Sequence, residues 1–128
     1  MKKIITIILI ALAVTSCTSN ETEIEETNII VGLWKLTSIK AMNQEFINTC
    51  KSKDNIEVRS DKTFTITSHF EDNNCEIQMS SGTWSDNLNS TYKFTAVGDT
   101  QIFTLTADNK LTFSFQQDSE TVTYVYLK

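Results

Sequence analysis

Cysteine and histidine are the side chains of this sequence best suited to bind a metal or to act as a nucleophile. The chain contains three cysteines, Cys17, Cys50 and Cys75, and a single histidine, His69. A structural zinc site needs four ligands, mostly cysteine or histidine, and none of the cysteines belongs to a CxxC pair. A nucleophilic cysteine needs a nearby base, and the sequence has no GxSxG, HExxH or glycine-rich phosphate loop. We therefore expect no catalytic residue, no metal site and no cofactor, which argues against an enzyme.

Cys17 follows an apolar segment near the start of the chain. Two lysines precede an uncharged, mostly aliphatic run over residues 4–14, which is too short to span a bilayer but suits an export signal. The run ends in "VTSC" (residues 14–17), a pattern that resembles the lipobox of bacterial lipoproteins. The resemblance implies that residues 1–16 are a lipoprotein signal peptide and that Cys17 is lipidated and anchors the protein in a membrane. The alternative is an ordinary signal peptide in which a cysteine occurs by chance.

Residues 17–29 form an acidic segment with four glutamates and no aromatic side chain. Like charges repel and extend a chain, so we expect a flexible tether here. The segment resembles the acidic stretch after the acylated cysteine in cell-surface lipoproteins of Bacteroidetes, although a plain solubilising linker would look the same. Thr18, rather than aspartate, after the cysteine fits sorting to the outer membrane. We therefore expect a lipid-anchored protein of the cell envelope, in the outer membrane, facing either the periplasm or the cell surface.

Cys50 and Cys75 remain as an even pair once Cys17 carries a lipid. Thiols of exported proteins tend to be oxidised, so we expect a disulfide between these two residues. The bridge would close a loop of 26 residues, counted inclusively. In the chain-entropy model such a loop stabilises a fold by roughly 3.5 kcal/mol.

From residue 31 onward the chain repeats one pattern, in which apolar and polar residues alternate and a short polar cluster follows. Aspartate and asparagine dominate these clusters, as is typical of hairpin turns. The segment 41–50 breaks the rhythm and is expected to be a helical turn or a lid-like loop. Eight consecutive strands predict an all-β fold, an eight-stranded antiparallel up-and-down β-barrel over residues 30–128, with a two-sheet sandwich as the alternative. The eight runs are Val31–Lys40, Asn55–Ser60, Thr63–Phe70, Cys75–Trp84, Ser90–Ala96, Gln101–Thr106, Leu111–Gln117 and Thr121–Leu127.

Alternation also assigns each side chain to the inner or the outer face of the barrel. His69 falls on the outer face, together with the threonines of its run. Trp84 joins the inner face only if Gly82 marks a β-bulge, as an isolated glycine in a strand often does. Eleven of the twelve aromatic residues, all except Phe46, are expected inside. The predicted inner face comprises Trp34, Leu36, Ile56, Val58, Phe64, Ile66, Phe70, Ile77, Met79, Tyr92, Phe94, Phe103, Leu105, Phe113, Phe115, Val122, Tyr124 and Tyr126.

An excess of acidic side chains limits the possible partners. Sixteen Asp and Glu residues outnumber eleven Lys and Arg residues, which gives a formal charge of -5. A protein that binds nucleic acid needs a basic face, so we expect no nucleic-acid partner. An anionic membrane surface would also repel this chain. The lipid on Cys17 is therefore the expected link to the membrane.

The first strand begins with Gly32-Leu33-Trp34, and a glycine two residues before a tryptophan resembles the lipocalin signature. Further features follow in order: a cysteine, "DKTFT", a second cysteine, "GTWS" and "NKLTF". Together they resemble the lipocalin-like domain lipoproteins of Bacteroidetes over residues 30–128. The resemblance implies a barrel that binds a small hydrophobic or amphipathic ligand. The candidate lining residues, which could equally fill the interior as plain core, are Trp34, Tyr92, Phe94, Phe103, Tyr124 and Tyr126.

A second hypothesis is a non-catalytic protein-interaction or inhibitor module displayed at the cell envelope. In size, anchor and disulfide the chain is similar to small periplasmic inhibitors of host lysozymes. The function would then reside in the loops at 41–50, 71–74 and 86–89, whose acidic groups would face a basic target. The spacing of the residues favours no particular partner protein.

Overall fold

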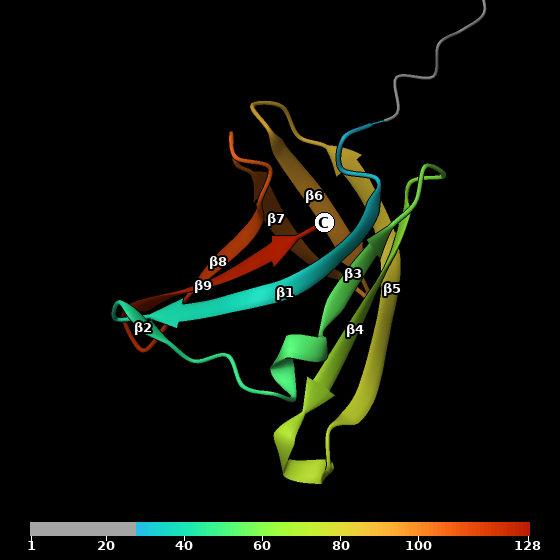
Figure 1. Ribbon diagram of the computed structural model, residues 1–128. Coiled ribbons are helices and arrows are strands. Elements are labelled where there is room, and N and C mark those ends of the chain that lie inside the picture. Colours follow the sequence, from blue (N-terminus) through green and yellow to red (C-terminus); the bar gives the residue numbers. More distant parts are fainter. Residues whose placement is uncertain (1–27) are drawn as a thin grey trace, which may run out of the picture.

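The computed structural model describes residues 28–128, and most of this part of the chain is β-strand (Figure 1). The predicted signal peptide, Cys17 and most of the tether lie outside the described residues. Along the described chain the elements are β1 (Gly32–Ala41), β2 (Gln44–Glu45), the 3-10 helix η1 (Lys51–Lys53), β3 (Asn55–Val58), β4 (Thr63–Phe70), the 3-10 helix η2 (Glu71–Asn73), β5 (Glu76–Asp86), β6 (Thr91–Ala96), β7 (Asp99–Leu105), β8 (Leu111–Gln117) and β9 (Glu120–Leu127).

The strands form one antiparallel sheet that closes on itself. From β3 to β9 each strand pairs with the next one along the chain, and β1 pairs with both β3 and β9. The short strand β2 pairs only with the end of β1. The eight longer strands close into a ring, so no strand of the eight is left without a neighbour on either side, although some strands pair over only part of their length. The predicted eight-stranded barrel is confirmed.

The turns use the residues that the sequence indicated. Asparagine and aspartate tolerate left-handed backbone conformations better than other residues that carry a Cβ atom. Turn residues of this kind with positive φ are Asn43, Asn74, Asn89, Asn109 and Asp118.

The two ends of the barrel differ. The chain enters at the end that also holds the C-terminus and the turns β3–β4, β5–β6 and β7–β8; we call it the closed end (Figure 1). Trp34 is 1% exposed there, and its Nε1 donates a hydrogen bond to the Ile30 carbonyl at 2.7 Å. The Lys128 ammonium lies 5.2 Å from the Trp34 ring centre, and the Lys62 ammonium lies 3.8 Å from that of Trp84. The opposite end, with the turns β6–β7 and β8–β9, is the open end.

Aromatic rings fill the middle of the barrel. The ring of Phe94 lies 4.9 Å from that of Phe64 and 4.7 Å from that of Phe103, measured between centres. Burial of each such side chain contributes about 1.5–3 kcal/mol. The buried core cluster comprises Ile30, Trp34, Leu36, Ile39, Ile56, Val58, Phe64, Trp84, Tyr92, Phe94, Phe103, Leu105, Leu111 and Tyr126.

The β4–β5 register contains no bulge. Its eight residue pairs run without interruption, so the prediction that Gly82 marks a bulge is wrong. Phe64 lies inside the barrel opposite Gly82, and opposite residues share a face, so Gly82 and Trp84 both point inward. A Cβ atom at Gly82 would overlap the carbonyl oxygen of Thr95 and crowd the Phe64 ring. Glycine is therefore required here for the close approach of β6.

This register turns Ile77 and Met79 outward. Their side chains are 60% and 66% exposed, so the prediction that they belong to the inner face is wrong. Across the strand pair they face His69 and Thr67, on the outer side of β4. Because alternate residues share a face, an inward Trp84 without a bulge excludes an inward Ile77 or Met79.

The half of β5 nearest the open end extends past β6. Only residues 83–86 of β5 pair with β6, whereas β4 accompanies β5 down to Glu76. In Figure 1 this part of β4 and β5, which we call the β4–β5 arm (residues 68–81), projects beyond the rest of the barrel. Phe70 lies near its tip, 42% exposed, with the Lys51 ammonium 4.6 Å from its ring centre. Phe70 was expected inside and lies outside the core, because the barrel ends before it.

His69 is buried, which corrects the prediction that it faces solvent. Alternation places it on the outer side of β4, but its side chain is only 9% exposed. The backbone N–H of His69 donates to the Asp54 carboxylate at 2.6 Å, and its ring Nδ1 lies 3.0 Å from the same oxygen. The β3–β4 pairing ends at Asn55↔Thr67, so Asp54 accepts the hydrogen bond that a longer β3 would have taken.

The segment 41–50 breaks the strand rhythm, as expected, but begins as a short hairpin. The Glu45 carboxylate accepts hydrogen bonds from the Ser38 hydroxyl and the Ile39 N–H, both at 2.7 Å, which hold β2 against β1. The segment then leads to η1 through Cys50, which is bonded to Cys75 with a Cα–Cα distance of 5.5 Å. The expected disulfide is present.

Candidate functional site

The barrel interior is accessible beside the β6–β7 turn, at the open end. A pocket of about 260 Å³ lies there, which we call the mouth pocket. Its walls come from β4, β5, β6 and β7, where inward positions lie beyond the packed aromatic core. The lining residues are Phe64, Ile66, Ser80, Phe94, Ala96, Val97, Asp99 and Gln101.

A second opening lies in the wall between β7 and β8. These strands pair only at Thr104↔Thr112 and Leu105↔Leu111, close to their turn, and no further pair joins them in the described chain. The resulting space of about 570 Å³, which we call the β7–β8 cleft, shares Asp99 and Gln101 with the mouth pocket. The two spaces therefore adjoin. The cleft is lined by Asp99, Thr100, Gln101, Ile102, Phe113, Ser114 and Phe115.

Flat aromatic rings form one side of the cleft. The Phe113 ring stacks on Phe103 at 5.1 Å and on Phe115 at 5.6 Å between centres, with 27° between the planes in both pairs. Tyr124 lies 5.9 Å from Phe115 on the neighbouring strand. Stacked rings of this kind suit a planar or extended apolar group.

The charge at the two openings is sparse and negative. Asp99 is the single ionisable residue among those that line the mouth pocket and the cleft. Polar contacts are available from Gln101, Thr100 and the hydroxyls of Ser80 and Ser114. This chemistry favours a neutral or cationic head group over an anionic one.

Two tyrosines behind the openings stay uncharged. Burial, followed by the nearby negative charge of Asp54, raises the pKa of both Tyr124 and Tyr126 above the ordinary phenol value. Both phenols therefore remain neutral at physiological pH.

Of the six predicted lining residues, Phe94 lines the mouth pocket. Trp34, Tyr92, Phe103 and Tyr126 are all at most 7% exposed and pack into the core, and Tyr124 is half-buried against it. Their role in binding stays a prediction. Sequence reasoning did not select Ile66, Ala96 or Gln101 as lining residues, although each occupies an inward position on its strand. Distance along the strand from the closed end, combined with alternation, would have indicated them.

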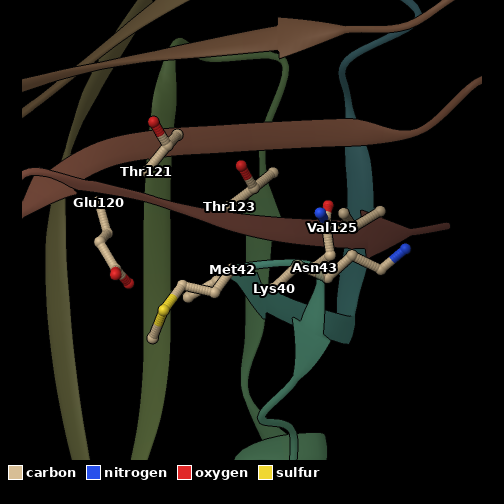
Figure 2. Close-up of a pocket in the computed structure, with 8 residues that line it drawn as sticks. Lys40, Met42, Asn43, Glu120, Thr121, Thr123 and Val125 are labelled. Carbon is tan, nitrogen blue, oxygen red and sulfur yellow. The ribbon is translucent and has the colours of Figure 1, made fainter.

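A third hollow lies on the outer face of the barrel. Figure 2 shows this groove of about 610 Å³, with side chains from β9 beside those of the β1–β2 turn. Lys40 and Glu120 contribute opposite charges, and Met42 contributes an exposed apolar side chain. The β9 residues of this groove alternate with the inward Val122, Tyr124 and Tyr126, so the groove is separate from the aromatic interior. Its lining residues are Lys40, Ala41, Met42, Asn43, Glu120, Thr121, Thr123 and Val125.

The three loops of the interaction hypothesis do not meet on one surface. Segments 41–50 and 71–74 lie toward the open end, and the Cys50–Cys75 bridge ties the first to the start of β5. Segment 86–89 belongs to the β5–β6 turn at the closed end. A single partner would contact the first two loops or the third.

Metal ligands do not cluster in residues 28–128: no group of three His, Cys, Asp or Glu side chains there could hold an ion. Within the same residues, no helix is long and apolar enough to cross a membrane.

Comparison with known protein families gives two matches. Residues 30–113 match the family model described as a lipocalin-like domain, and residues 1–18 match the model of the prokaryotic membrane lipoprotein lipid attachment site. Neither the curated proteins nor the solved structures give a significant match.

Proposed function

Because the chain belongs to the lipocalin-like domain family and is a lipid-anchored lipoprotein of the cell envelope, we propose that its barrel binds a small, mainly apolar ligand. The ligand occupies the mouth pocket and extends into the β7–β8 cleft. The protein acts by binding and not by catalysis. The observation that carries this proposal is the pair of adjoining openings beside the stacked rings of Phe103, Phe113 and Phe115, in a barrel whose other end is packed solid.

The volumes set the size of the ligand. Sites for small molecules commonly measure about 300–1,000 Å³. The mouth pocket, at about 260 Å³, falls just below this range, and the cleft, at about 570 Å³, lies within it. A ligand with one compact end and one flat or extended end fits this division.

Asp99 sets the preferred charge. It lines both spaces, so a carboxylate or sulfonate on the ligand would meet a like charge in either position. A neutral ligand, or one with a cationic group near Asp99, avoids this repulsion.

The attachment is proposed in finer detail. Residues 1–16 form the signal peptide, Cys17 carries the lipid, residues 17–29 form the tether and residues 30–128 the binding domain. Thr18 after the cysteine supports retention in the outer membrane, and the acidic tether supports display of a Bacteroidetes type at the cell surface.

A neutral fluorophore tests the binding site. N-Phenyl-1-naphthylamine gains fluorescence in apolar pockets, and residues 18–128 should bind it saturably. The Ala96→Phe variant adds a ring to the mouth pocket and should weaken binding by about tenfold or more. The Thr95→Phe variant is the matched control, because the neighbouring side chain points outward on the same strand. Absence of saturable binding to the parent chain, or equal loss in both variants, would contradict the proposed site.

A charged analogue tests the role of Asp99. The anionic probe 8-anilinonaphthalene-1-sulfonate should bind more weakly than the neutral probe, and the Asp99→Asn variant should reduce that difference. Equal affinity of both probes for the parent chain would remove the electrostatic part of the proposal and leave the apolar part standing.

A further inference from the structure

The outer half of β5 presents an unpaired strand edge. Residues 77–81 pair with β4 on one side. On the other side, β6 pairs only with residues 83–86 of β5 within the described chain, so the β5 residues before Thr83 have no partner strand there. The Trp84 N–H bonds to the Lys62 carbonyl, so the backbone groups of Trp84 point toward β4. Backbone groups alternate in direction along a strand, so those of Ile77, Met79 and Ser81 point away from β4. Three donors and three acceptors thus line this edge.

The edge has none of the features that normally prevent strand addition. Natural edge strands carry lysine, proline or a bulge, or are covered by another element. Here residues 77–82 read IQMSSG, without charge or proline, and the ladder with β4 is regular. Ile77 and Met79 expose apolar side chains on the same segment. An exposed neutral edge with apolar side chains favours pairing with another strand.

We propose that two copies of this chain pair through β5, edge to edge and antiparallel, about a two-fold axis at Gln78. In this register Ile77 of each copy lies opposite Met79 of the other copy. The backbone N–H and carbonyl groups of these residues, which point away from β4, form the hydrogen bonds between the two copies. The segment is neutral, so no like charges oppose one another around the axis. A centre at Gln78 also keeps the second copy clear of Gly82, against which the Thr95 carbonyl lies.

The register predicts a closed dimer of modest affinity. A two-fold axis makes the contact isologous: the β5 edge of each copy pairs with that of the other, so no free edge remains to add further copies. The contact involves about five residues of each copy and is smaller than a standard interface, which indicates a weak pair in solution. Two copies held in one membrane by their lipids have a higher effective concentration, which strengthens the pair. Ser80 lines the mouth pocket, so pairing brings the two mouth pockets to the same side of the dimer.

Sedimentation velocity of residues 18–128 tests this proposal; every residue of the core cluster lies between Ile30 and Tyr126, so this chain retains the barrel. We expect a dimer whose fraction rises over about a hundredfold increase in concentration. The Met79→Lys variant should weaken association by about tenfold or more, because a charge replaces an apolar contact at the edge. The Leu33→Lys variant is the control, because Leu33 is 46% exposed on the outer face of β1 and lies away from β5.

Amide hydrogen exchange gives a second readout that needs no variant. The N–H groups of Ile77 and Met79 should exchange more slowly as the concentration of the parent chain rises, whereas that of Gln78, which points to β4, should not change. A parent chain that stays monomeric throughout the range would overturn the proposal. So would a dimer that Met79→Lys leaves intact, or one whose concentration-dependent protection lies elsewhere.

Discussion

Replacing Gly82 with alanine adds one methyl group where β5 and β6 approach most closely. The new Cβ atom would overlap the carbonyl oxygen of Thr95 and lie against the Phe64 ring. That oxygen belongs to the β6 backbone, so it can move only if the Thr83↔Thr95 pair opens. Loss of the two hydrogen bonds of this pair costs about 2 kcal/mol.

Two further effects complete the estimate. Overpacking against Phe64 costs about 1–3 kcal/mol. Alanine lowers the conformational entropy of the unfolded chain relative to glycine, which stabilises the folded state by about 0.4–1 kcal/mol and offsets part of this cost. The expected net loss in the free energy of unfolding is about 3 kcal/mol, a large part of the roughly 5–15 kcal/mol typical of a small domain.

Urea denaturation followed by the fluorescence of Trp34 and Trp84 would measure this loss. The Gly98→Ala variant is the matched control: Gly98 has a φ of 79°, and its Cβ atom would meet open space. Only backbone strain acts there, so its cost should be about 1–2 kcal/mol. If Gly82→Ala lowers the free energy of unfolding by less than about 0.5 kcal/mol, or by less than Gly98→Ala does, the close approach of β6 is refuted. A β-bulge at Gly82 would then be the better explanation of the glycine.

Three further predictions concern the disulfide, the buried carboxylate and an exposed one. Thiol titration of the lipidated protein should find no free thiol, and a Cys50→Ser/Cys75→Ser double variant should lose roughly 3.5 kcal/mol in urea denaturation; two free thiols in the parent would reject the bridge. The Asp54→Ala variant should lose about 2–3 kcal/mol, because the His69 N–H and ring would lose their acceptor, whereas Asp54→Asn should lose less; equal losses would show that the carboxylate oxygen is not the acceptor. Hydrogen bonds from Lys110 and then from Thr106 lower the pKa of Asp108 to about 2 from its ordinary value of 3.8. The folded pKa lies below the unfolded one, so this contribution is present above pH 3.8 and is lost as the pH falls toward 2. Carboxyl NMR titration should report this pKa directly, and the acid-induced loss of stability should be smaller in Asp108→Asn.

The strand pattern predicted the closed barrel because most of its signals are local. Alternation placed Trp34, Phe64 and Phe94 inside correctly, and asparagine and aspartate marked the turns. Both signals depend on neighbours in sequence. They therefore survive without knowledge of which distant strands pair.

The errors arise where non-local contacts decide the outcome. Gly82 was interpreted as a bulge, although its reason is the carbonyl of Thr95 on another strand. His69 was assigned to solvent, because alternation cannot show that the segment around Asp54 covers it. Ile77 and Met79 have apolar side chains typical of a core, but they lie on the part of β5 that extends past β6. The sequence of β5 does not show how far the neighbouring strand extends beside it.

The site was found only in part for the same reason. The pattern indicated which side chains face inward but not how far each strand pairs with the next. The β7–β8 cleft exists because two long strands share only two residue pairs. Its lining residues Phe113 and Phe115 were expected inside, yet nothing in their own segment shows that the wall beside them is open.

The polypeptide joins the barrel at the pole opposite its aperture. Ile29 and Ile30 are held there by Lys128 and Trp34, so the leash to the bilayer leaves from the sealed base. Ten residues lie between Cys17 and Asn28, and the eleven steps from one Cα atom to the next limit the leash to about 40 Å when fully stretched. In the proposed function, a ligand would therefore enter at the end of the barrel farthest from the point of attachment.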